Sequence, residues 1–205
     1  FLDHLFIANT HSYLLTFTNK GKVYWTKVYK IPEVGRYSKG KAIINLVGIE
    51  QDEKISAVIP VRHFDDEHNL VFATKKGLVK KTNLKYYSRP RQGGIWAIKL
   101  MEEDDLIEVI KTDGTQQIML ATREGMSVRF NETDVRPVSR HSQGVSGIRL
   151  KKKDDSVVGM VVAEPEKTLL TITENGFGKR TIIADYRLIN RGGSGVINIK
   201  TTDRN

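Results

Sequence analysis

The tetrapeptide Thr18-Asn19-Lys20-Gly21 decides how this chain is read, because the same pattern, Thr-x-x-Gly, returns three more times. The other copies end at Gly77, Gly125 and Gly176, so that successive glycines are 56, 48 and 51 residues apart. A repeat with a period of about 50 residues is typical of stacked supersecondary units. Fold and function therefore have to be derived for one repeat and then extended along the chain.

A second phrase recurs with the same period. It consists of Gly, then three residues later a small or aliphatic residue, followed by Ile, any residue, and Leu or Ile. Its copies begin 19, 17, 19 and 17 residues after the glycines of the first phrase, at Gly40, Gly94, Gly144 and Gly193. We therefore predict one domain over residues 1–205, divided into four repeats at approximately 1–50, 51–103, 104–153 and 154–205.

Each repeat opens with two short runs rich in β-branched and aromatic residues, which predict strands rather than helices. These runs are 5–8 and 13–17, 55–59 and 70–73, 106–110 and 117–121, and 157–162 and 169–172. Thr-x-x-Gly then forms a tight turn, and a third strand follows at 22–25, 78–81, 126–129 and 177–180. The second phrase is the fourth strand. Four short antiparallel strands in about 50 residues predict an all-β, propeller-like fold of repeated blades.

Composition excludes several classes of protein. There is no cysteine, which excludes a disulfide framework, a zinc–cysteine site and a thiol nucleophile. No apolar run approaches the roughly 18 residues of a membrane-spanning helix, and no signal peptide is visible, so we expect no membrane partner and a reducing cytoplasm. The chain begins within an apolar run at Phe1 rather than with Met, so we expect a piece of a longer polypeptide.

The net charge of +9 and the sequence pI of about 9.6 favour a polyanionic partner, of which nucleic acid is the common one. The alternative is ordinary solubility charge. Basic residues gather at two places in each repeat, whereas the acids (Glu50, Asp52, Glu53, 102–105, Asp154 and Asp155) are expected at the opposite end. The turn group is Lys20, Lys22, Lys75, Lys76, Lys80, Lys81, Arg123, Arg129, Lys179 and Arg180. The connection group, before the second phrase, is Arg36, Lys39, Lys41, Lys85, Arg89, Arg91, Arg136, Arg140, Arg187 and Arg191.

Equivalent positions of a repeat come to equivalent places on successive blades. A basic cluster in every repeat therefore predicts a continuous basic belt around one side of the array. Such a belt suits the phosphate backbone of duplex DNA bent around a rim. We predict sequence-independent DNA binding by both groups of basic residues.

Together these residues resemble the C-terminal domain of the A subunit of bacterial DNA gyrase. The most specific passages are 4–15, 17–24, 27–33 and 39–46, and the likeness covers essentially the whole chain. The resemblance implies a six-bladed β-pinwheel in which blades exchange strands. It also implies that duplex DNA wraps around the basic rim with a positive crossing, which supports negative supercoiling by the ATP-driven holoenzyme.

The resemblance further implies what lies elsewhere. The cleaving tyrosine belongs to the N-terminal part of the A subunit, and ATP with Mg belongs to the B subunit of an A2B2 type II topoisomerase, an isomerase of the bacterial cytoplasm associated with the nucleoid. No catalytic residue, metal or cofactor is therefore expected in this chain.

One departure from the family concerns its signature box, Gln-Arg-Arg-Gly-Gly-Lys-Gly. The box would lie before Phe1, and only the degenerate stretch 190–195 is similar to it. We therefore expect this piece to bind DNA while bending it less. Without the box, the sister family, which comprises the C-terminal domains of the A subunits of topoisomerase IV, stays open.

Two further readings stay open on the residues alone. His63, Asp65 and His68 could form a metal site, against the alternative of a solvated hairpin loop present in only one repeat. A protein-recognition propeller of the kelch or WD type is the other, although its signature dipeptides are absent and Trp25 and Trp96 occupy non-equivalent positions.

Overall fold

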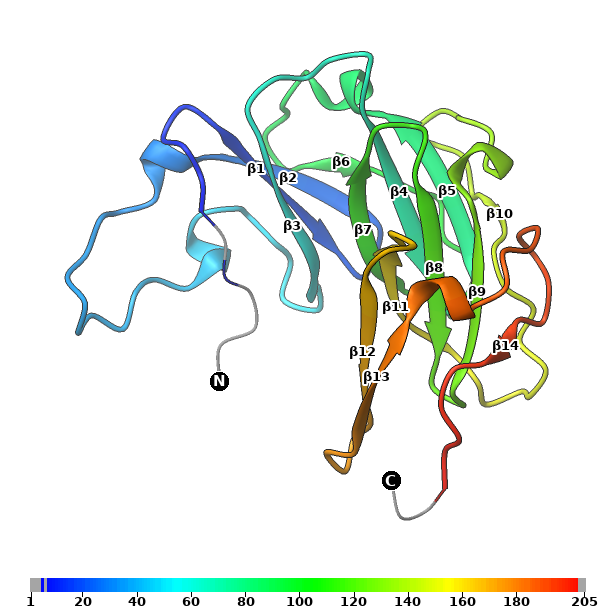
Figure 1. Cartoon of the computed structure of the whole chain (residues 1–205). Coiled ribbons are helices and arrows are strands. Elements are labelled where there is room, and N and C mark those ends of the chain that lie inside the picture. Colours follow the sequence, from blue (N-terminus) through cyan, green and yellow to red (C-terminus); the bar gives the residue numbers. More distant parts are fainter. Residues whose placement is uncertain (1–4, 6, 203–205) are drawn as a thin grey trace.

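The computed structural model describes residues 5 and 7–202 of the chain, and it confirms the all-β fold. Three four-stranded antiparallel sheets and one two-stranded hairpin stand side by side (Figure 1). The helical elements in the described part of the chain are short 3-10 turns, and none of them could cross a membrane.

The first sheet has the order β3-β1-β2-β6, the second β10-β5-β4-β7 and the third β11-β8-β9-β14; β12 and β13 form the last hairpin. The strands of the first sheet are β1 (Tyr13–Thr18), β2 (Lys22–Lys27), β3 (Ile55–Val61) and β6 (Ile95–Trp96). Those of the second are β4 (Asn69–Thr74), β5 (Leu78–Asn83), β7 (Leu106–Thr112) and β10 (Val145–Ser146). Those of the third are β8 (Gln117–Thr122), β9 (Met126–Asn131), β11 (Val157–Val162) and β14 (Val196–Ile197). The last hairpin comprises β12 (Thr168–Ile172) and β13 (Gly178–Ile182), and the 3-10 turns are η1 (Val28–Lys30), η2 (Ile43–Asn45), η3 (Leu84–Tyr87), η4 (Glu132–Asp134) and η5 (Ile183–Asp185).

Each sheet is assembled from two successive repeats. One repeat supplies the hairpin around its Thr-x-x-Gly turn, and the next repeat supplies both outer strands. In the first sheet, β3 pairs with β1 from Tyr13↔Val61 onward, and β6 pairs with β2 at Val23↔Ile95. This exchange of strands is the pinwheel arrangement that the resemblance implies.

A pair of hydrogen bonds joins successive repeats at each turn glycine, and we call it the glycine lock. The carbonyl of the turn glycine accepts hydrogen bonds from two consecutive amides of the following repeat, at 2.8 and 3.2–3.3 Å. The three locks join Gly21 to Ala97 and Ile98, Gly77 to Gly147 and Ile148, and Gly125 to Asn198 and Ile199.

The glycine lock explains why glycine is required at the turn. Gly77 has a φ of +86°, and a Cβ built on it would lie 2.7 Å from the carbonyl oxygen of Ile148. The turn therefore needs both the left-handed backbone and the open space that only glycine provides.

Two predicted strands of the first repeat are wrong. In the run 5–8, the described residues Leu5, Ile7 and Ala8 lie in no strand, and Leu5 and Ile7 are exposed. The phrase 40–46 contains the 3-10 turn η2 instead of a strand. The physical reason is the strand exchange, since these segments are equivalent to outer strands that pair with a preceding hairpin, and the described part of the chain contains none.

The fourth copy of the second phrase has a different register from the predicted one. Gly195, rather than Gly193, takes the position of Gly94 and Gly144, because all three have positive φ values and each would place a Cβ within 3 Å of a carbonyl oxygen on the adjacent hairpin. The lock residue is accordingly Ile199 and not Ile197.

The strand order separates an inner edge from an outer edge. Strands β3, β7 and β11 pack against one another in the middle of the molecule (Figure 1). Since β6, β10 and β14 are at the opposite end of each sheet, they form the outer edge. The second phrase therefore places its strands at the rim of the array.

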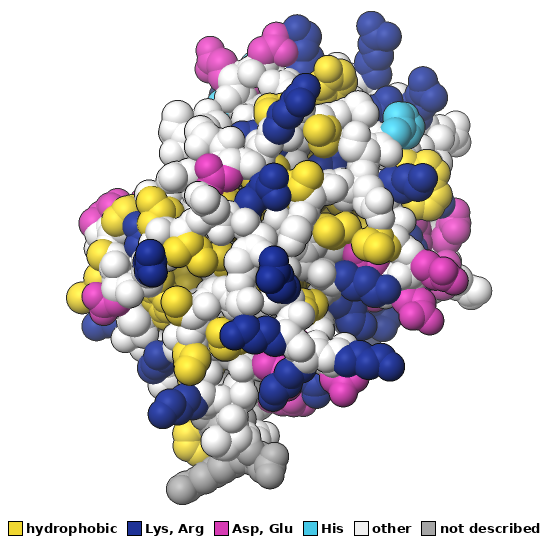
Figure 2. Space-filling view, turned by 90° about the vertical axis from the view of Figure 1, so that its right-hand side faces the viewer, with side chains coloured by type: hydrophobic (Ala, Val, Ile, Leu, Met, Phe, Trp, Pro, Cys, Tyr) yellow, Lys and Arg dark blue, Asp and Glu magenta, His cyan; other side chains and the backbone are white. Residues whose placement is uncertain are grey.

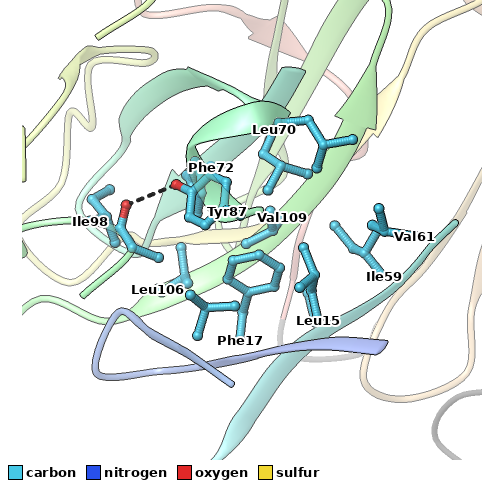
Figure 3. Close-up of a cluster of buried hydrophobic side chains, with 14 residues drawn as sticks. Leu15, Phe17, Ile59, Val61, Leu70, Phe72, Tyr87, Ile98, Leu106 and Val109 are labelled. Carbon is cyan, nitrogen blue, oxygen red and sulfur yellow. Dashed lines mark hydrogen bonds between the residues drawn. The ribbon is translucent and has the colours of Figure 1, made fainter. Parts of the chain in front are cut away.

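The core lies between neighbouring sheets. Between the first two sheets, Leu15, Phe17, Phe72 and Tyr87 are fully buried (Figure 3). Phe17 meets Phe72 edge to face with ring centroids 5.6 Å apart, which is a favoured aromatic geometry. The Tyr87 hydroxyl donates a hydrogen bond to the carbonyl of Ala97 at 3.3 Å, so that the core is tied to the outer phrase.

We predict that Gly77→Ala lowers the free energy of unfolding by about 3–4 kcal/mol, because it adds left-handed strain and disrupts two hydrogen bonds. Gly93→Ala is the matched control, since Gly93 has a φ of +83° but no atom within 4 Å of a built Cβ. The control should lose only about 1–2 kcal/mol, from strain alone. Urea unfolding of both variants measures the difference, and equal losses would show that the lock contributes nothing.

Candidate nucleic-acid interface

The connections between the 3-10 turns and the outer strands cross from one sheet to the preceding one. Val138 donates its amide hydrogen to the carbonyl of Lys81 in β5, and Ile189 does the same to Arg129 in β9, both at 2.9 Å. Each connection then continues into the outer strand of that preceding sheet, β10 or β14. The connection group of these repeats is thereby placed along the outer edge.

Backbone hydrogen bonds also join neighbouring connections. Lys99 donates its amide hydrogen to the carbonyl of Ser142 at 3.2 Å, and Arg149 donates to Gly193 at 2.9 Å. Gly192 donates to Gly147 at 2.6 Å, within the stretch that is similar to the family's box. The rim is therefore a continuous band with fixed spacing between its basic side chains.

Most of the connection group is exposed. Arg89, Arg91, Arg136 and Arg187 are exposed on the second, third and fourth repeats. Figure 2 shows Lys and Arg side chains spread over the face that carries the outer strands, with Asp and Glu mainly near its borders.

The remaining members of the connection group have partners within the protein. Arg140 is partly buried, and Arg191 donates to the carbonyls of Asp134 and Ser146 at 2.8 and 3.0 Å. Lys85 pairs with Asp66 at 2.6 Å.

The first repeat does not contribute to this rim. Arg36, Lys39 and Lys41 are exposed, but they lie on the loop that extends away from the sheets on the left of Figure 1. The structure therefore does not bring these three residues together with the rest of the connection group.

Three members of the turn group are buried, so the prediction that they contact DNA is wrong for them. Lys80, Lys81 and Arg129 have exposed fractions of 1%, 5% and 7%. The Lys80 ammonium donates to the carbonyls of Ala97 and Arg140, both at 2.6 Å. Its charge is used inside the protein, where it fixes the path of the next repeat.

A second recurring contact uses the fourth residue after each turn glycine, and we call these residues the clamp. Trp25, Lys81 and Arg129 each donate to the 3-10 turn of the next repeat. Their acceptors are the carbonyls of Tyr87 at 2.9 Å, Glu132 at 3.0 Å, and Ile183 and Tyr186 at 2.7 and 2.9 Å. Arg180 has the same position in the fourth repeat and is exposed, with no partner among the described residues.

The acids do not lie at the opposite end of each repeat from the turn group, as predicted. Lys20 lies 3.7 Å from Asp52, and Lys75 lies 4.0 Å from Asp105. The antiparallel pairing of each hairpin with the following outer strand brings the acidic turn beside Thr-x-x-Gly, since Thr18 is opposite Ile55. The turn end therefore carries both signs of charge.

The other turn-group residues are at the surface. Lys22 pairs with Glu50 at 2.5 Å, and Lys76 donates to the carbonyl of Glu102 at 2.6 Å. Arg123, Lys179 and Arg180 are exposed. The connection group, rather than the turn group, carries the uncompensated positive charge.

Sequence reasoning missed Lys99 and Arg149, which are exposed directly after the lock residues. In the observed register, Lys200 holds the same position in the fourth repeat and is exposed as well. The signal was a basic residue following the second-phrase isoleucine, and the incorrect register of the fourth copy placed Asn198 there instead.

Burial changes the acid–base properties of the buried lysines. Burial lowers the pKa of Lys80 to about 7, and the charge of Arg140 acts in the same direction. Burial also lowers the pKa of Lys81, while Glu132, 3.8 Å away, opposes that shift.

The histidine-containing loop is organised by its own hydrogen bonds. Asp65 accepts the backbone amide of His68 at 2.9 Å and lies 2.8 Å from its ring Nδ1, whereas His63 is exposed. Among the described residues, no group of three or more His, Asp or Glu side chains is placed to hold a metal ion.

Comparison with known proteins points in one direction. The family model described as "DNA gyrase C-terminal domain, beta-propeller" matches residues 12–62, 68–113, 116–164 and 167–204. The A subunit of DNA gyrase from Salmonella typhimurium LT2 is 44% identical, and that from Escherichia coli K12 is 45% identical, each over the whole chain. The chain spans 23% of the length of these relatives.

Solved structures agree with the sequence relatives. A DNA topoisomerase IV C-terminal domain superposes with a TM-score of 0.84 at 31% identity, covering 92% of this chain and 59% of that one. A DNA gyrase A C-terminal domain superposes with a TM-score of 0.81 at 26% identity, covering 96% and 64%.

The buried Lys80 predicts a pH dependence of stability. Its pKa of about 7 in the folded protein lies below the ordinary value of 10.5, so between these pH values the unfolded chain holds more protons and stability rises with pH. The difference in unfolding free energy between wild type and Lys80→Met should grow by about 1–2 kcal/mol from roughly pH 7 to 8.5. Denaturant unfolding at several pH values measures it. Lys153→Met, at an exposed lysine, is the control, and a Lys80→Met curve parallel to wild type would contradict the prediction.

Proposed function

Because the chain belongs to the family of DNA gyrase C-terminal domains, we propose that it binds duplex DNA along the outer edge of its sheets and bends the duplex around that edge. The observation that carries this proposal is the recurrence of exposed basic residues on each connection, at Arg89, Arg91, Arg136 and Arg187. Lys99 and Arg149 add exposed charge on the same edge.

The contacts are made to phosphate and not to bases. Arginine and lysine side chains on loops can follow a phosphate backbone, whereas base readout requires an element that enters a groove. The backbone hydrogen bonds between connections hold the basic side chains at fixed intervals. A rigid, curved row of cations favours a bent path of the duplex over a straight one.

In the complete protein, this wrap would have a positive crossing and would present a DNA segment for strand passage. ATP-dependent negative supercoiling would then require the rest of the A subunit, which cleaves DNA, and the B subunit, which binds ATP and Mg, in an A2B2 enzyme at the nucleoid of the bacterial cytoplasm. This chain would contribute DNA geometry and no catalytic residue.

Removing charge from the connection group should weaken DNA binding on every sequence alike. We predict that a variant with Arg89, Arg91, Arg136 and Arg187 all changed to Gln loses affinity and that its slope of log affinity against log salt falls by about 3–4, close to one per phosphate contact. Fluorescence anisotropy with duplexes of unrelated sequence measures both quantities.

The matched control is Lys20→Gln with Lys75→Gln, because these turn lysines already face Asp52 and Asp105. It should change affinity and slope only slightly. Equal losses in both variants, or a changed preference for particular sequences, would argue against phosphate binding by the connections.

A topoisomerase IV type of C-terminal domain is the second candidate, which the superposition on the solved topoisomerase IV domain favours. Ligation of nicked circular DNA in the presence of the chain at low salt separates the two. For a gyrase-type domain we expect linking number to shift toward positive values. DNA retardation without such a shift would favour the second candidate, or a wrap that needs further blades.

A further inference from the structure

The last hairpin has an empty junction. Its turn glycine, Gly176, has a φ of +82°, as the other turn glycines do, yet a Cβ built on it would meet no atom within 4 Å. Among the described residues, β12 and β13 pair only with each other, while every other hairpin has an outer strand on both sides. The glycine lock of the fourth repeat is therefore unoccupied.

Side chains on this hairpin are exposed where their equivalents are buried. Leu170 is 62% exposed, whereas Leu15, Val71 and Met119, three residues before the threonine of the other turns, are 0%, 0% and 2% exposed. In the third sheet, Met119 is covered by Ile183 of the following 3-10 turn.

The clamp is free at the same place. Arg129 donates to two carbonyls of the next 3-10 turn, while its equivalent Arg180 has none to reach among the described residues. The last hairpin thus presents a glycine carbonyl, an apolar surface and a guanidinium, and the three internal junctions show that one repeat of this same type satisfies all three.

The first repeat presents the complementary parts, also unused. Gly40 has a φ of +71° with no atom within 4 Å of a built Cβ. Ile44 is 44% exposed, whereas the equivalent lock residues Ile98 and Ile148 are 0% and 3% exposed. The turn η1 buries none of its residues, in contrast to η3, η4 and η5.

We propose that the last hairpin of one copy of this chain binds the first repeat of a second copy, head to tail, through the junction that joins successive repeats within the chain. The amides of Ile43 and Ile44 would bond to the Gly176 carbonyl. Arg180 would donate to η1, and Leu170 would be covered by Val28. The second copy is the occupant because what one end lacks is what the other end leaves unused, which defines a heterologous contact.

The test is sedimentation equilibrium of the purified chain, freed of nucleic acid and kept at high salt so that DNA cannot bridge copies. The mass should rise above the 23.2 kDa of one chain as concentration increases. Ile44→Asp blocks the first repeat and Leu170→Asp blocks the last hairpin, and both side chains are exposed in a single copy, so folding should be retained by circular dichroism.

Each blocked variant alone should stay at the mass of one chain. An equimolar mixture should form a one-to-one dimer, because Leu170→Asp keeps an intact first repeat and Ile44→Asp keeps an intact last hairpin. Tyr86→Asp, at an exposed side chain on η3, should associate as the wild type does. A wild type that stays at one chain, blocked variants that still associate, or a mixture that does not would each overturn the proposal, and none of these results depends on DNA binding.

Discussion

The carbonyl of the turn glycine is the point on which the arrangement of repeats depends. It leaves its own hairpin unpaired and accepts two amides from the next repeat, so that each sheet is completed by residues about 70 positions further along, as from Gly21 to Ile98. No repeat can satisfy its own turn. Stability is therefore shared between neighbours, as in other repeat proteins in which the interface between units carries much of the folding energy.

The buried cations follow from the same arrangement. Connections and 3-10 turns expose carbonyl groups that no strand pairs, and a buried carbonyl without a donor is costly. Lys80 and Arg129 each supply two hydrogen bonds to such carbonyls. Because Lys80 holds the carbonyl of Arg140, the interior of the second sheet directly positions a connection at the rim.

Local features can be predicted from the sequence, and non-local ones cannot. The hairpins β1–β2, β4–β5 and β8–β9 agree with the prediction because turn chemistry and apolar runs are short-range signals. Which repeat supplies the outer strands depends on contacts far apart in the chain, and so the sequence pattern predicts two strands in the first repeat that it does not form. The fourth register fails because 190–195 contains competing glycines, and only the backbone conformation selects Gly195.

The candidate site shows why a recurring charge has two meanings in a repeat protein. A residue that binds an external polyanion should be exposed in every repeat, as Arg89, Arg136 and Arg187 are. A residue that binds the next repeat should be buried everywhere except at the end of the array. Arg129 is buried and Arg180 is exposed, and they occupy the same position. Sequence periodicity alone registers both kinds as a repeated positive charge. Burial along the array separates them, and it assigns the clamp to cohesion between repeats and the connection group to the surface available to DNA.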